Sequence, residues 1–235
     1  QESALAEIKK DMEASCPMNR LVQGDVGSGK TIVGFIAALG AVEAGYQAAI
    51  MSPTEILSEQ HYIGIHRYAE ALGIRCVLLT GSLTKKEKAR ALAEIKDDGV
   101  DIVIGTHALF QKAVEFRRLG IVIIDEQHRF GVEQRALLRK KAEAGEGASP
   151  DVLIMTATPI PRTLAMTVFG DLDVSVIDEL PPGRHPVKTR VLREKDRDSA
   201  YAAILAELKA GNRAYIVYPL VEESGELSLK DAVSM

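Results

Sequence analysis

The stretch from Gly24 to Thr31 constrains the fold more than any other part of this sequence, because it follows the phosphate-binding pattern G-x-x-x-x-G-K-[ST]. Glycines let the backbone wrap closely around an anion, and the N–H groups of the loop and of the next helix then point at it. Residues 20–23 are typical of a strand, and residues 31–44 of a helix that Gly45 ends. This context disfavours the alternative, a glycine-rich turn that binds nothing. The predicted nucleotide-binding residues are Gly24, Asp25, Val26, Gly27, Ser28, Gly29, Lys30 and Thr31.

Two acidic residues follow the most apolar predicted strand, residues 119–125. Lys30 can reach the β- and γ-phosphates of ATP as a point charge, and Thr31 can offer its hydroxyl to Mg²⁺. Asp125 can hold the same ion at a strand end beside the loop, and Glu126 can orient or deprotonate the attacking water. A pair of surface acids that begins a turn is the alternative. We therefore expect ATP and Mg²⁺ as cofactors, with Thr31 and Asp125 as metal ligands and Lys30, Asp125 and Glu126 as catalytic residues.

Strands and helices alternate along the chain, which predicts an α/β fold with a mostly parallel, doubly wound sheet. Further strands are expected at residues 46–52, 75–80, 101–105 and 152–156, and further helices at 2–15, 54–72, 84–97, 132–144 and 162–169. A proline-rich stretch at 181–186 then breaks the pattern and is typical of a linker. After it come a predicted strand (187–192), a helix (199–210) and a strand (214–218). The predicted organisation is a first domain at 1–180, the linker, and the start of a second α/β domain at 187–235.

The composition excludes some classes of protein. Of the 235 residues, 46% are hydrophobic and 26% charged, and the net charge of −4 argues against a protein that coats nucleic acid by bulk charge. The two cysteines have no metal-binding spacing, so reduced structural thiols are favoured. The sequence has no signal peptide, and its longest uncharged apolar run, residues 32–42, is too short to span a bilayer. We expect a cytoplasmic protein. Because the sequence begins at Gln1 and ends without a stop signal, we also expect it to be part of a longer chain.

Several blocks resemble a known family. They are residues 23–31, 52–57, 125–135, 156–163, 170–184 and 218–224. Together they resemble the RecG family of bacterial ATP-dependent DNA helicases in superfamily 2, over essentially the whole chain. The resemblance implies a RecA-like first domain with the start of a second motor domain. It also implies a monomeric helicase or translocase that acts on forked or branched DNA, including Holliday junctions, in recombination and DNA repair.

The same resemblance assigns roles to further residues. It implies that His128 belongs to the catalytic motif and that Gln1 reads the adenine base. The implied DNA-binding residues are Pro53, Thr54, Thr80, Gly81, Gly105, Thr106 and His107. The residues implied to couple the ATP site to the DNA site are Thr156, Ala157 and Thr158. The hydroxyls of the two threonines are expected to bond to Asp125 or His128. From the residues alone, simpler interpretations stay open. Thr54 can be a helix cap, the segments at 80–81 and 105–107 can be ordinary turns, His107 can be a structural histidine, and residues 156–158 can be a threonine-rich strand end.

Two alternatives to a RecG-type helicase remain at this point. One is a double-stranded DNA translocase of the transcription-repair coupling type, and the other is a P-loop switch that senses nucleotide without work on DNA. Glu126 argues against a switch, since a sensor has less need of a positioned base. The RecG resemblance also implies an arginine finger and a DNA-reading domain that this sequence does not contain. We therefore expect this chain to bind Mg-ATP weakly and not to unwind DNA by itself.

Overall fold

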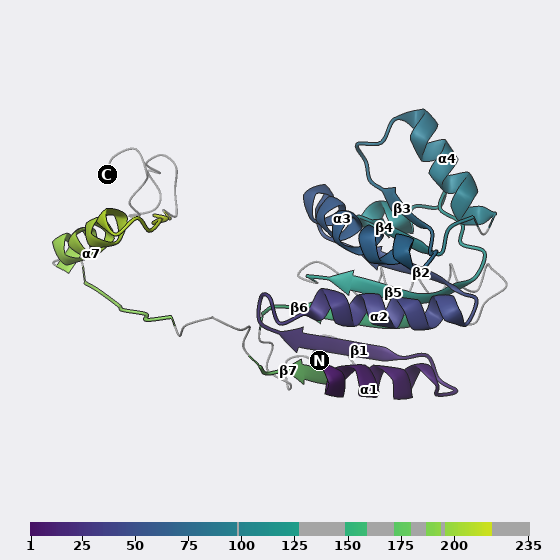
Figure 1. Ribbon diagram of the computed structural model, residues 1–235, viewed down its shortest axis with the longest axis horizontal. Helices are drawn as coiled ribbons and strands as arrows, with labels where there is room; N and C mark the ends of the chain where they lie inside the picture. The colour runs from purple at the N-terminus through teal and green to yellow at the C-terminus, as the bar shows by residue number, and fades with distance from the viewer. Residues whose placement is uncertain (98, 127–148, 159–171, 180–186, 194–195, 218–235) are drawn as a thin grey trace, which may run out of the picture. The chain divides into compact units, whose positions relative to one another are not determined.

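The computed structural model describes residues 1–97, 99–126, 149–158, 172–179, 187–193 and 196–217, which belong to two compact units, 1–184 and 185–235. The first unit holds an α/β sheet structure (Figure 1). Its described elements are α1 (Glu2–Met12), β1 (Asn19–Gly24), α2 (Lys30–Glu43), β2 (Gln47–Met51), α3 (Glu55–Ala71), β3 (Cys76–Leu79), α4 (Lys85–Lys96), β4 (Ile102–Gly105), the 3₁₀ turn η1 (His107–Phe110), β5 (Leu119–Asp125), β6 (Asp151–Thr156) and β7 (Asp173–Ile177). The second unit contributes α7 (Arg197–Lys209).

The described strands form one sheet in the order β3-β4-β2-β5-β6-β1-β7, and every neighbouring pair is parallel. This confirms the predicted α/β fold with a parallel sheet. Because the strands are parallel, all their carboxyl ends meet at one edge. The register places Gln23 beside Thr156, Asp125 beside Met155, and Met51 beside both Gly105 and Ile124. The segments that follow the strands therefore gather at this edge, although they are far apart in the sequence.

Alternating residues of the central strands supply two hydrophobic cores, one on each face of the sheet. On one face, Ile121 and Ile123 pack with buried residues of α1, α2 and α3. On the other face, Val122 and Ile124 pack with α4 and the segment after η1. Burial on both faces explains why these strands are almost uninterrupted runs of Ile and Val. The core thus fixes the sheet as a rigid frame for its carboxyl edge.

Local chemistry sets the ends of the helices as the sequence predicted. Thr54 caps α3 by accepting a hydrogen bond from the Leu57 N–H at 3.3 Å. Thr84 and Glu87 form the predicted capping box at the start of α4. Gly45 and Gly73, with φ of 80° and 71°, adopt the left-handed conformation just after α2 and α3.

Three sequence-based expectations on strands are wrong. Residues 187–192 and the described part of 214–218 form no strand, and their apolar side chains are exposed, with Val191 at 96% and Val217 at 89%. An apolar run becomes a strand only when a neighbouring strand accepts its hydrogen bonds and covers one of its faces. Conversely, β7 was not predicted, because it has only five residues and its burial does not follow its polarity: Ser175 is buried while Val176 is exposed. The predicted helices 132–144 and 162–169 and the linker 181–186 lie outside the described residues.

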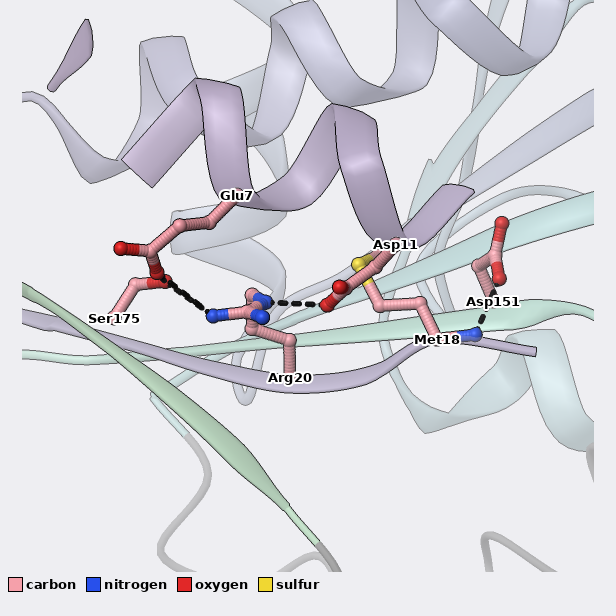
Figure 2. Close-up of polar contacts among 6 residues, drawn as sticks. All are labelled: Glu7, Asp11, Met18, Arg20, Asp151 and Ser175. Atoms are coloured by element: carbon pink, nitrogen blue, oxygen red, sulfur yellow. Dashed lines mark hydrogen bonds and ion pairs between the residues drawn. The ribbon is translucent and has the colours of Figure 1, made fainter. Parts of the chain in front are cut away.

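Arg20 joins three elements through a buried polar cluster (Figure 2). Its guanidinium donates to Asp11 Oδ2 at 2.7 Å, to Glu7 Oε2 at 2.8 Å and to Ser175 Oγ at 2.8 Å. Its side chain is 9% exposed, and Ser175 also donates to Glu7. Since Arg20 lies on β1, the acids on α1 and the serine on β7, the cluster fixes α1 and the edge strand against the strand that leads into the P-loop.

Gly105 has no room for a side chain. A Cβ at this buried position would overlap the carbonyl oxygen of Leu79 on β3 and touch Leu109. Because the obstacle is backbone in a neighbouring strand, we expect Gly105→Ala to lower the free energy of unfolding by about 2 kcal/mol. Gly64→Ala is the matched control: Gly64 is exposed on α3 with nothing within 4 Å of the added carbon. It should raise stability by roughly 0.5–1 kcal/mol. Urea unfolding would measure both, and equal effects would contradict the packing argument.

Among the described residues, no helix combines the length and the apolar character that a membrane crossing requires.

Candidate nucleotide-binding site

The predicted P-loop has a defined shape between β1 and α2. Gly27 and Gly29 adopt φ values of 81° and 86°, which residues with a side chain rarely do, and Gly29 is the N-cap of α2. Lys30 is buried, and its Nζ donates to the carbonyl oxygens of Gly24 at 2.7 Å and Asp25 at 2.9 Å. The ammonium group of Lys30 therefore lies against the first residues of the loop, and Lys30 itself begins the 14-residue helix α2 at its positive end.

A cavity of about 270 Å³ lies beside this loop. The residues that line it are Val26, Gly27, Gly29, Lys30, Thr31, Asp125, Glu126 and Ala157. The fold thus brings the predicted phosphate-binding residues together with the predicted acidic pair, as the parallel sheet requires. Backbone N–H groups and a lysine on one wall and two carboxylates on the other suit a phosphate chain that carries a divalent cation.

The two acids differ in their surroundings. Asp125 Oδ2 accepts a hydrogen bond from His61 Nε2 on α3 at 2.7 Å, and the two side chains are 12% and 11% exposed. Glu126 has a φ of 52°, and its N–H donates to the Met155 carbonyl at 3.0 Å. A left-handed conformation is uncommon for glutamate, and here it turns the chain at the end of β5, where Glu126 lines the cavity.

The residues present fit a magnesium–nucleotide complex better than a metal site built by protein alone. In the described part of the chain, no group of three or more His, Cys, Asp and Glu side chains could hold an ion. Thr31 and Asp125 are the predicted oxygen ligands, and Mg²⁺ commonly takes one or two protein ligands with phosphate oxygens and waters. Ser28 Oγ is buried in the loop without a hydrogen-bond partner among the described residues, which leaves one polar atom for a ligand.

Gln1 lies against the P-loop. Its Nε2 donates to the Ser28 carbonyl at 2.8 Å, and its side chain covers Gly29 so closely that a Cβ there would displace the Gln1 amide. The structure therefore brings Gln1 to the loop. Its role in reading adenine stays a prediction.

The segments predicted to contact DNA follow β2, β3 and β4 at the carboxyl edge of the sheet. Pro53, Thr54, Gly81 and His107 are exposed there, so His107 is no core histidine. The other three are buried and shape the turns. Thr80 bonds to Ser82 Oγ at 2.9 Å, Thr106 accepts from the Ala108 N–H at 3.4 Å, and Gly105 makes room for β3. Glu55 Oε1 accepts from the Gly81 N–H at 2.9 Å and so joins two of these segments.

The three residues predicted to couple the sites follow β6. Thr156 and Thr158 bond to each other through their hydroxyls at 2.9 Å, while Ala157 lines the cavity. The predicted bond from these hydroxyls to Asp125 is not formed: the two hydroxyls bond to each other, and Asp125 bonds to His61. His128 lies outside the described residues. Sequence reasoning missed His61, whose partner is 64 positions away in the chain.

Cys16 and Cys76 are both free thiols, and they differ in exposure: Cys16 is exposed and Cys76 is half-buried. Burial, with a smaller contribution from Asp101, raises the pKa of Cys76 from 9.0 to about 11. At pH 8 this lowers its thiolate fraction about 100-fold, and the greater nucleophilicity of a more basic thiolate restores about tenfold. We therefore expect iodoacetamide to modify exposed Cys16 at least about tenfold faster than Cys76. Mass spectrometry of timed samples would measure this, and equal rates would contradict it.

A parallel sheet with a P-loop after one strand and an acidic pair after another defines the class of P-loop nucleotide-binding domains. The sequence profile described as DEAD/DEAH box helicase matches residues 1–167. The chain belongs to this helicase family. Its structure is similar to RecG bound to a three-way DNA junction, with a TM-score of 0.75 and 44% identity over 94% of this chain and 29% of that one.

Curated relatives match the chain over its whole length. It is 52% identical to the ATP-dependent DNA helicase RecG of Aquifex aeolicus over 99% of this chain, and 50% identical to that of Bacillus subtilis over 100%. The chain spans 29% and 34% of the lengths of these two proteins. The DNA-bound helicase MrfA, at 18% identity and a TM-score of 0.62, shares the fold. The expected resemblance to RecG is confirmed.

Proposed function

We propose that this chain is the ATP-binding part of a RecG-type helicase, which uses ATP hydrolysis to move on branched DNA in recombination and repair. The observation that carries the proposal is the cavity that collects Lys30, Thr31, Asp125 and Glu126 at one edge of the sheet. The similarity to RecG over the whole chain supports the DNA substrate. It favours this reading over a translocase of the transcription-repair coupling type.

The residues of the cavity suggest how the chain would contribute. The loop N–H groups and Lys30 would bind the phosphates, while Thr31 and Asp125 would hold Mg²⁺, which neutralises phosphate charge when bound. Glu126 would orient or deprotonate the attacking water. The exposed residues Pro53, Thr54, Gly81 and His107 would face one DNA strand, and the positive N-terminal end of α3 suits a phosphate.

The domain assignment, a RecA-like ATP-binding domain at 1–180, a linker at 181–186 and the start of a second motor domain at 187–235, is part of the proposal. So are a monomeric state and action in the bacterial cytoplasm. Movement on DNA needs the opening and closing of a cleft between two motor domains. We therefore expect this chain alone to bind Mg-ATP without separating DNA strands.

ATP turnover by the chain, with and without forked DNA, tests the proposal, with Lys30→Ala as the blank. Turnover at the level of the blank fits a motor that needs both domains, provided that wild-type chain binds Mg-ATP. Separation of DNA strands by this chain alone would refute the expectation that unwinding needs both motor domains. ATP turnover above the blank that is the same with and without forked DNA would favour the alternative, a nucleotide switch.

Glu126→Gln separates a motor from a switch. The amide keeps the size of the side chain and cannot accept a proton, so ATP binding should persist while hydrolysis falls about 10²–10⁴-fold. The measurement combines a nucleotide titration with an ATP turnover assay. Both are made in this chain or, if it does not hydrolyse ATP, in a longer relative that does. Unchanged turnover would remove Glu126 from the catalytic role.

A further inference from the structure

His61 connects α3 to the acidic wall of the cavity. It lies in the second turn of the helix, and its Nε2–H donates to Asp125 Oδ2 at 2.7 Å. Both side chains are nearly nine-tenths buried, so water competes little for this bond. None of the motifs in the sequence includes His61. The contact is therefore an addition to the site that the motifs define.

An ionised carboxylate has two oxygens with about four acceptor positions, so the bond from His61 leaves others for a cation or its waters. What the bond removes is the freedom of Asp125 to rotate. Partners that orient a metal-ligating side chain change metal affinity by roughly 10–100-fold when they are removed. We propose that His61 is a positioning residue that holds Asp125 in the orientation that binds the Mg²⁺ of Mg-ATP. This inference rests on the proposed function.

The helix that carries His61 also contacts the candidate DNA edge. Thr54 caps its first turn, and Glu55 accepts a hydrogen bond from the Gly81 N–H at 2.9 Å. From Thr54 to His61 the helix advances about 10 Å, which is two turns of a rigid element. One helix thus links two predicted DNA-contacting segments to the predicted metal ligand, with His61 as the link.

The test is the binding of a fluorescent ATP analogue to this chain while Mg²⁺ is titrated, which does not require hydrolysis. His61→Leu should raise the Mg²⁺ concentration at half-maximal effect about tenfold and leave binding without Mg²⁺ unchanged. His61→Gln keeps a donor N–H near the same place and should restore most of the wild-type behaviour. His66→Leu is the matched control on the same helix. Its ring stacks on Tyr62 at 5.0 Å, and it should leave the Mg²⁺ requirement unchanged.

A second background shows whether His61 acts through Asp125. Asp125→Asn alone should raise the Mg²⁺ requirement, and adding His61→Leu should then change it no further. An equal effect of His61→Leu in both backgrounds would overturn the positioning role, as would a wild-type Mg²⁺ response in His61→Leu. Wild-type chain that binds no Mg-ATP would instead refute the proposed function itself. Circular dichroism of each variant identifies those that fail to fold.

Discussion

Replacing Lys30 with alanine is expected to weaken Mg-ATP binding about 100-fold, or roughly 3 kcal/mol. Among the described residues that line the phosphate cavity, Lys30 is the only cation, and it is buried. A charge-assisted hydrogen bond to phosphate in such a place is stronger than one exposed to water. Titration with a fluorescent ATP analogue would measure the loss.

The control for Lys30 must separate charge from fold, because its ammonium also bonds to two loop carbonyls. Lys30→Met keeps the aliphatic stem and should lose binding to the same extent. Lys9→Ala removes an exposed lysine of α1 that pairs with Glu13, and it should leave binding unchanged. Wild-type affinity in Lys30→Ala would place the nucleotide outside this cavity.

Replacing Arg20 with leucine is expected to lower the free energy of unfolding by about 3 kcal/mol, because it leaves Asp11 and Glu7 without their cation. The estimate is at the low end for a buried pair, since Glu7 is 45% exposed and water can reach it. For a domain of this size the melting temperature should fall by roughly 6–12 °C. Thermal unfolding followed by circular dichroism would measure it.

Arg90→Leu is the matched control for Arg20. It breaks an ion pair with Glu94 on α4 in which the arginine side chain is 82% exposed, so we expect no measurable change in melting temperature. Equal shifts in the two variants would show that burial of the Arg20 cluster contributes nothing. If Arg20→Leu also weakened nucleotide binding, α1 and its N-cap residue Gln1 would be implicated in the site.

The sequence predicted most of the first unit because its signals are local. Periodic apolar residues, the capping box at Thr84, and glycines after helices each act within a few residues. The P-loop and the acidic pair were predicted for the same reason, and the parallel sheet then brought them to one cavity.

What the sequence did not predict depends on partners that are far away in the chain. His61 meets Asp125 across 64 positions, and Arg20 meets Ser175 across 155. Residues 187–192 and β7 each contain three apolar residues, but residues 187–192 have no described strand beside them, whereas β7 pairs with β1. Strand pairing, more than strand propensity, decided these segments.

The place of β1 in the sheet has a consequence for synthesis. Among the described strands of this unit, β1 is made first, but its two neighbours, β6 and β7, are made last, since Gln23 pairs with Thr156 and Gly24 with Ile177. β2, β3, β4 and β5 find one another over shorter separations and can assemble while the chain is still emerging from the ribosome. The strand that leads into the P-loop therefore lacks its first partner, β6, until residue 156 has been made, and its second partner, β7, until residue 177 has been made. A nascent chain would acquire its nucleotide site in the final step of folding this unit.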